Sequence, residues 1–134
     1  NSGRSQMAEA LLRHLSHGTI EAYSAGSQPA AQVHPLALQV MEHAGLDMSQ
    51  ARSKHFDEFR GQHFDAIVTV CDRVREVCPA FSDEPELIHW SIADPAQETG
   101  SEEVRYNVFE QTSHQLATRI RYLITHLELV VSPF

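Results

Sequence analysis

The sequence has no apolar run that approaches the roughly 20 residues needed to cross a bilayer. It also lacks an excess of basic residues, because 10 Lys and Arg stand against 18 Asp and Glu and the formal net charge is −8. A diffuse basic surface for nucleic acid is therefore excluded, and an anionic substrate has to be bound by a local site. The 2 cysteines are too few for the disulfide scaffold of a small secreted protein. We expect a cytoplasmic protein that binds no membrane and, through this domain, no nucleic acid.

The order of predicted elements alternates between strand and helix. Periodicity and stop signals predict helices at Ser5–His17, Pro35–Ala44 and Glu102–Leu127, a short helix at Asp72–Val77, and strands at Thr19–Ala25, Asp65–Val70 and Glu86–Trp90. This order is typical of an α/β sandwich, with a parallel sheet between two layers of helices. The 134 residues suit a single domain, residues 1–134. Because the first helix follows a loop directly, we expect one more strand before Asn1, which makes the domain N-terminally incomplete.

Two finer expectations concern packing. The β-branched run within Asp65–Val70 predicts a strand that is buried on both faces of the sheet. The long last helix, which Ser101 is expected to cap, should turn one stripe of side chains inward. That stripe comprises Val104, Val108, Thr112, Leu116, Ile120, Leu123 and Leu127.

The first residues form a small, polar, glycine-containing turn that runs into a helix. Free backbone N–H groups at a helix N-terminus can surround a tetrahedral anion, and a guanidinium offers donors that match two of its oxygens. The candidate oxyanion-binding residues are therefore Asn1, Ser2, Gly3 and Arg4, and Ser5 either caps the helix or donates to a nearby thiolate. Taken alone, the same residues also fit an ordinary helix start with a surface arginine.

Cys71 and Cys78 lie at the end of the predicted buried strand and in the polar segment that follows it. The spacing alone allows a redox pair, but a buried core cysteine is an easy alternative for Cys71. No second pair of ligands has the spacing of a zinc site. Farther along, Asp94 either serves as a general acid facing the oxyanion loop or simply forms an Asp-Pro turn.

Three segments together resemble one family: the string from Asn1 to Glu9, the segment Val68–Pro79 with both cysteines, and the stretch His89–Ala96. They are similar to the low-molecular-weight phosphatase superfamily, and more closely to its thioredoxin-coupled arsenate reductases. The resemblance implies a three-layer α/β sandwich with a four-stranded parallel sheet. It also implies a nucleophilic cysteine three positions before Asn1.

The resemblance further implies a relay of three cysteines. The nucleophile would form an adduct with arsenate, Cys71 would attack the nucleophile's sulfur and release arsenite, and Cys78 would then attack Cys71. Arg4 would hold the oxyanion, Ser5 would assist the thiolate, and Asp94 would be the acid. No cofactor is implied beyond an external thiol reductant, either thioredoxin or a low-molecular-weight thiol.

Some members of the superfamily hold a potassium ion behind the oxyanion loop. Asn1, Glu9 and Ser24 match the positions of its ligands, whereas Lys54 stands where another acid would be. We expect the lysine ammonium to replace the ion, so that the loop is supported by Glu9, Ser24 and Lys54 and no metal is required. Plain surface charges at residues 9 and 54 are the alternative.

Two other functions fit the sequence. One is a low-molecular-weight tyrosine phosphatase, although that branch usually carries aromatic residues after its Asp-Pro, where Ala96 and Gln97 stand here. The other is an oxyanion-sensing domain without catalysis, because Ser53–Phe59 and Cys71–Pro79 also resemble reductase-type domains fused to arsenic-responsive repressors. The phosphate or arsenate oxyanion is the expected ligand in each case.

Overall fold

The computed structural model describes residues 3–25, 33–48, 51–52, 54–59, 61–70 and 86–131. In chain order their elements are α1 (Arg4–Leu15), α2 (Pro35–His43), the 3-10 helix η1 (Phe56–Phe59), β1 (Ala66–Thr69), β2 (Glu86–His89), the 3-10 helix η2 (Pro95–Gln97) and α4 (Glu102–Val131). The three longer predicted helices are confirmed, and the last of them extends to Val131. The short helix predicted at Asp72–Val77 lies outside the described residues.

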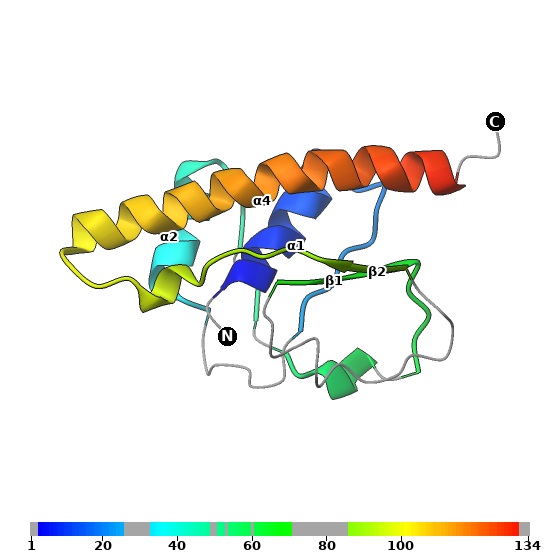
Figure 1. Cartoon of the computed structure of the whole chain (residues 1–134), viewed down its shortest axis with the longest axis horizontal. Coiled ribbons are helices and arrows are strands. Elements are labelled where there is room, and N and C mark those ends of the chain that lie inside the picture. The colour runs from blue at the N-terminus through cyan, green and yellow to red at the C-terminus, as the bar shows by residue number, and fades with distance from the viewer. Residues whose placement is uncertain are drawn as a thin grey trace.

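The two strands lie side by side and run parallel, with Ala66 opposite Glu86 and Thr69 opposite His89. Helices α1 and α4 lie on one side of the strands and η1 on the other (Figure 1). On the helix side, Val68 packs against the hydrophobic core. The parallel pairing confirms the α/β class, and these two strands make up the sheet within the described part of the chain.

Two strand predictions were wrong. The residues of β1 are half-buried rather than buried on both faces, because the long described helices cover only one side of the sheet. No strand is assigned over Thr19–Ala25, although residues 21–25 lack any helical turn. There the carbonyl oxygen of Ala22 accepts hydrogen bonds from Nε and Nη2 of Arg13, at 3.1 and 2.5 Å, instead of one from a neighbouring strand.

The hydrophobic core lies where α4 crosses α1 and α2 (Figure 1). Its fully buried side chains come from all three helices, and the largest are Met7, Met41, Phe109, Leu116 and Ile120. Trp90, which follows β2, is also buried and joins this core. The N-terminus of α1 is thereby fixed beside the strands, which is where the candidate site forms.

The inward face of α4 agrees with the predicted stripe in its middle and differs at its start. Thr112, Leu116, Ile120 and Leu123 are buried, but Val104 is 45% exposed. The core contact at this end comes from Phe109, which the predicted stripe omits. Val104 belongs to the first turn, where Ser101 Oγ caps the helix by accepting its backbone N–H at 3.2 Å.

Helix α4 is long enough to span a membrane but is too polar to do so. Its 30 residues include charged side chains in its first turn. Among the described residues, none of the helices combines sufficient length with sufficient apolar character to cross a bilayer.

Candidate active site

Gly3 is the first described residue of the site, and it is the N-cap residue from which α1 starts. Its φ of 93° lies in the left-handed region, which favours glycine. A Cβ added at this position would lie 3.0 Å from Cβ of Ala37, closer than side chains normally approach. Gly3 therefore rests directly on the first turn of α2.

Arg4 reaches the carboxyl ends of both strands. Its Nη1 donates to the carbonyl oxygen of Val70 at 3.2 Å, just after β1, and to that of Ile92 at 2.6 Å, beyond β2. Its Nη2 lies 3.9 Å from Oδ2 of Asp94, and the Arg4 side chain is 12% exposed. Because ligands of open α/β sheets bind at this edge, the structure places Arg4 and Asp94 together where a site is expected.

Asp94 forms the turn that the sequence predicted, and its side chain also faces Arg4. Its Oδ1 accepts the backbone N–H of Ala96 at 2.9 Å and caps η2, so the residue does form the Asp-Pro turn. Its Oδ2 faces Arg4, and its side chain is 24% exposed. A carboxyl group held in this way can exchange a proton with a ligand while its orientation stays fixed. Ser5, in the first turn of α1, is half-buried beside them.

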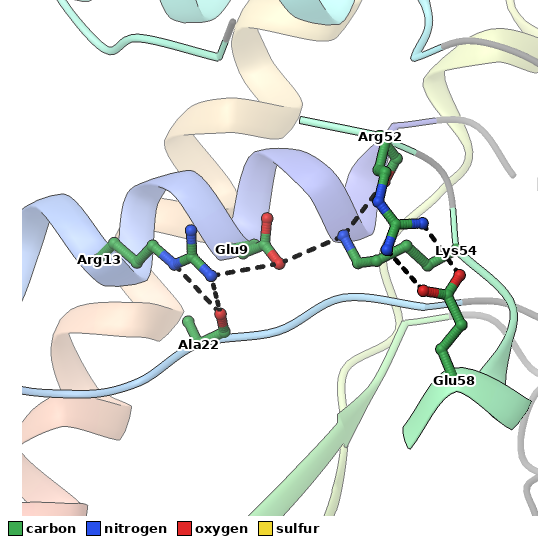
Figure 2. Close-up of polar contacts among 6 residues, drawn as sticks. All are labelled: Glu9, Arg13, Ala22, Arg52, Lys54 and Glu58. Carbon is green, nitrogen blue, oxygen red and sulfur yellow. Dashed lines mark hydrogen bonds and ion pairs between the residues drawn. The ribbon is translucent and has the colours of Figure 1, made fainter. Parts of the chain in front are cut away.

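A second polar group joins α1 to the segment that precedes η1 (Figure 2). The Glu9 carboxylate is 3.6 Å from Nζ of Lys54 and 3.8 Å from Nη2 of Arg13. The side chains of Glu9 and Lys54 are only 9% and 10% exposed. Lys54 also donates to the carbonyl oxygen of Arg52 at 3.2 Å. The surface reading of residues 9 and 54 is therefore wrong, because these two charges are buried against each other.

Two further features complete this group. The hydroxyl of Ser24 is buried without a hydrogen-bond partner among the described residues. Outside it, the exposed Arg52 makes a two-pronged contact with Glu58, at 3.0 and 2.5 Å. The hydrogen bond from Arg52 holds the pKa of the Glu58 carboxyl below its usual value. Within the described part of the chain, His, Cys, Asp and Glu side chains form no group of three suited to a metal ion.

Four predicted site residues, Asn1, Ser2, Cys71 and Cys78, lie outside the described residues. The described chain ends at Val70 on this side of the sheet, one residue before Cys71, and the carbonyl of Val70 is bound by Arg4.

Sequence reasoning missed two features of the site region. Thr69 and His89 are joined across the strands, with Oγ1 2.6 Å from Nδ1. His34 caps α2, because its Nδ1 accepts the backbone N–H of Leu36 at 3.1 Å. Partial burial is the main cause that lowers the pKa of His34 from 6.5, the charge of Arg105 adds to the effect, and Asp94 opposes it. The sequence signal that His34 caps a helix was its position directly before a helix-starting proline.

Comparison with known proteins extends these observations. The sequence model for low molecular weight phosphotyrosine protein phosphatases matches residues 1–131. A protein from Halalkalibacterium halodurans that is named arsenate reductase is 36% identical over 121 residues, which cover 90% of this chain and 86% of that protein.

Two solved structures are similar as well. An arsenate reductase in an oxidized state gives a TM-score of 0.77 at 28% identity, over 93% of this chain and 90% of the other. A thioredoxin-dependent arsenate reductase of Corynebacterium glutamicum gives a TM-score of 0.73 at 28% identity, over 97% of this chain and 58% of the other. The fold is thus the α/β fold of low-molecular-weight phosphatases. Matches that run along nearly the whole chain establish that it belongs to the low molecular weight phosphotyrosine protein phosphatase family.

Proposed function

We propose that this protein reduces arsenate to arsenite with thiols as the source of electrons. The observation that carries the proposal is the similarity, over 90% of the chain, to a protein named arsenate reductase. The Cys71 and Cys78 pair adds support, because hydrolysis of a phosphate ester requires no pair of redox cysteines. The reduction requires two electrons, which two thiols supply when they form a disulfide.

The proposed reaction begins at a cysteine three positions before Asn1. Its thiolate attacks arsenic and displaces one oxygen, which leaves as water once protonated, so that a sulfur–arsenic bond replaces an arsenic–oxygen bond. The Cys71 thiolate then attacks the nucleophile's sulfur, and the electron pair of the sulfur–arsenic bond stays on arsenic, which leaves as arsenite. Finally the Cys78 thiolate attacks the sulfur of Cys71 and releases the nucleophile as a thiolate. The Cys71–Cys78 disulfide remains for an external thiol to reduce.

The described side chains suit particular steps. Asp94 would protonate the departing oxygen, and the backbone N–H groups at the start of α1 would bind the remaining oxygens together with Arg4. The bonds from Arg4 to Val70 and Ile92 fix its guanidinium to both strand ends, so the positive charge stays at the edge where the oxyanion would bind. Positive charge and a helix N-terminus also favour the thiolate form of a nearby cysteine.

The finer architecture belongs to the same proposal. The sheet would have four parallel strands, the first of them before Asn1, within a single domain. Lys54 would take the place of a cation behind the loop, with Glu9 as its partner and Ser24 beside them, so that no metal or cofactor is needed. Thioredoxin is the favoured electron donor and a low-molecular-weight thiol the alternative. A cytoplasmic location would keep the relay cysteines reduced between cycles.

Phosphatase activity is the second candidate, because the matching family is described by phosphotyrosine substrates. The test compares two activities of the intact protein. Arsenate should drive consumption of NADPH through thioredoxin reductase and thioredoxin, whereas hydrolysis of an aryl phosphate should be slow. Efficient hydrolysis without arsenate-dependent consumption would overturn the proposal in favour of a phosphatase. Binding of arsenate without either activity would leave a sensing domain.

A further inference from the structure

The side chain of His34 caps α2 in a way that depends on its protonation state. Its Nδ1 accepts the backbone N–H of Leu36 at 3.1 Å. A ring nitrogen that accepts a hydrogen bond carries no proton, so the contact requires a neutral imidazole with its proton on Nε2. The usual caps, Ser, Thr, Asp and Asn, accept through oxygen and keep this ability near neutral pH. The choice of histidine therefore ties the start of α2 to a titratable group.

The capped turn is the part of α2 that Gly3 approaches. A Cβ at Gly3 would lie 3.0 Å from Cβ of Ala37 and 3.7 Å from Cβ of His34. On its other side the His34 ring packs against the ring of Phe109, with centroids 4.5 Å apart and an angle of 33° between the planes. Phe109 is fully buried in α4. His34 thus lies between the core residue Phe109 and Gly3 at the start of α1.

Charges from two other elements act on this imidazole. Partial burial, and after it the charge of Arg105 on α4, hold the pKa of His34 below 6.5, while Asp94 at the start of η2 opposes them. A proton on His34 would remove the acceptor of the cap. It would also add a positive charge near Asp94, whose carboxylate already lies 3.9 Å from Arg4. The added charge would favour the ionised carboxylate and so work against the proposed acid role of Asp94.

We propose that His34 is a positioning residue of the oxyanion site: its neutral imidazole holds the first turn of α2 against the loop at Gly3 and withholds an added positive charge from Asp94. The inference rests on the proposed function for what the site binds. The support of the loop itself is measurable with phosphate, without any turnover.

Two substitutions separate the cap from the ring. His34→Asn keeps a capping oxygen but has no ring and does not titrate, whereas His34→Phe keeps a ring against Phe109 but cannot accept a hydrogen bond. His114→Asn, on the exposed face of α4, is the matched control. Each intact protein is assayed for its melting temperature, for phosphate affinity by calorimetry, and for single-turnover arsenite release across the acid range.

His34→Asn should bind phosphate within about twofold of the unsubstituted protein, and His34→Phe should bind it about tenfold more weakly, which corresponds to the loss of one helix cap. The unsubstituted protein and His114→Asn should lose affinity and release rate as the pH falls through the lowered pKa of His34. In His34→Asn, the part of the decline that comes from protonation of His34 should be absent.

Equal phosphate affinity in His34→Phe and the unsubstituted protein would overturn the positioning role. An acid-side decline that is unchanged in His34→Asn would overturn the dependence on protonation. If the unsubstituted protein binds phosphate but releases no arsenite, the proposed function fails, and the phosphate comparison still decides the role of His34. A lower melting temperature in His34→Phe with unchanged affinity would show a structural cap only, which also contradicts the proposal.

Discussion

At the scale of single residues, the contact between Glu9 and Lys54 shows most clearly that these two side chains are not plain surface charges. The two side chains are 9% and 10% exposed, and the nearest oxygen and nitrogen are 3.6 Å apart. A buried charge that loses its partner is strongly destabilising, even where the intact pair contributes little. Arg13, at 3.8 Å, gives Glu9 a second and more exposed cation. The position of Lys54 agrees with the proposal that its ammonium replaces a bound cation.

Lys54→Ala should lower the free energy of unfolding by about 3 kcal/mol, at the low end for a broken buried pair because Arg13 remains near Glu9. Potassium chloride should restore part of this loss relative to choline chloride at the same concentration, since the vacated space adjoins the Glu9 carboxylate and the carbonyl oxygen of Arg52. Urea unfolding measures both effects. Adding Glu9→Gln to the variant should abolish the potassium response, and Arg52→Ala, in the exposed pair with Glu58, should show no such response. A potassium response that persists without the Glu9 carboxylate would contradict this account.

Gly3 offers a second test at this scale, because two separate features disfavour a side chain there. Gly3→Ala should destabilise the protein by more than Gly61→Ala, for which about 1 kcal/mol is expected from the left-handed backbone alone. Gly61 has a similar φ of 86°, but no atom of the described residues lies within 4 Å of an added Cβ. Thermal unfolding of both variants gives the comparison.

The additional loss of stability at Gly3 is attributed to the close approach to Ala37. Combining Gly3→Ala with Ala37→Gly should therefore recover part of that additional loss. If Gly3→Ala and Gly61→Ala cost the same, Gly3 does not rest on α2 in solution.

At the scale of elements, sequence patterns predicted the helices better than the strands. A helix satisfies most of its backbone groups locally, so caps and periodicity predict α1, α2 and α4 from nearby residues. A strand needs a partner that may lie far away in the sequence, and β-propensity reports only an extended, half-buried segment. The segment Thr19–Ala25 shows the difference, because Arg13 takes up the carbonyl of Ala22 and no ladder forms there.

Helix α2 should make the stability of the fold depend on pH through His34. The pKa of this imidazole is lowered in the folded protein, chiefly by partial burial, so the unfolded chain binds more protons near that pKa. The free energy of unfolding then rises with pH in this range: the contribution is fully present above the unfolded value of 6.5 and is lost as the pH falls through the folded value. His34→Asn should therefore lose less stability than the unsubstituted protein on acidification.

Urea unfolding at about pH 7.5 and about pH 5.5 checks this difference. Other histidines near carboxylates, such as His126 with its Nε2 2.8 Å from Glu86, are present in both proteins, so their effects cancel in the comparison. His114→Asn serves as the control. A loss of stability that is the same with and without the His34 imidazole would show that this group does not couple folding to pH.

At the scale of the whole molecule, the sequence predicted that Arg4 and Asp94 lie at the edge of the sheet but not how they are held. Arg4 and Asp94 were identifiable because each stands in a short segment of recognisable chemistry at an element boundary. The bonds from Arg4 to Val70 and Ile92 join residues far apart in sequence, and no local pattern indicates them. The same limit explains why the packing of His34 against Phe109 was missed, whereas its cap on α2 had a local signal.

The family resemblance related residues that are far apart in the sequence, which local patterns could not do. It related Glu9 to Lys54 across 45 positions, and the structure has these two side chains in contact. The order in which the cysteines react remains a proposal. The strand that ends beside Cys71 is anchored to Arg4 through Val70, whereas Cys78 follows a polar stretch of the sequence. We therefore expect Cys71 to react before Cys78.

The most direct test of this order is single-turnover arsenite release by two variants of the intact protein, with disulfides mapped by mass spectrometry. Cys78→Ser should release one arsenite per enzyme and stop with the upstream nucleophile bonded to Cys71. Cys71→Ser should release none and retain the arsenic adduct. Repeated turnover of Cys78→Ser with thioredoxin would contradict the three-cysteine relay and replace it with a mechanism that uses one or two cysteines.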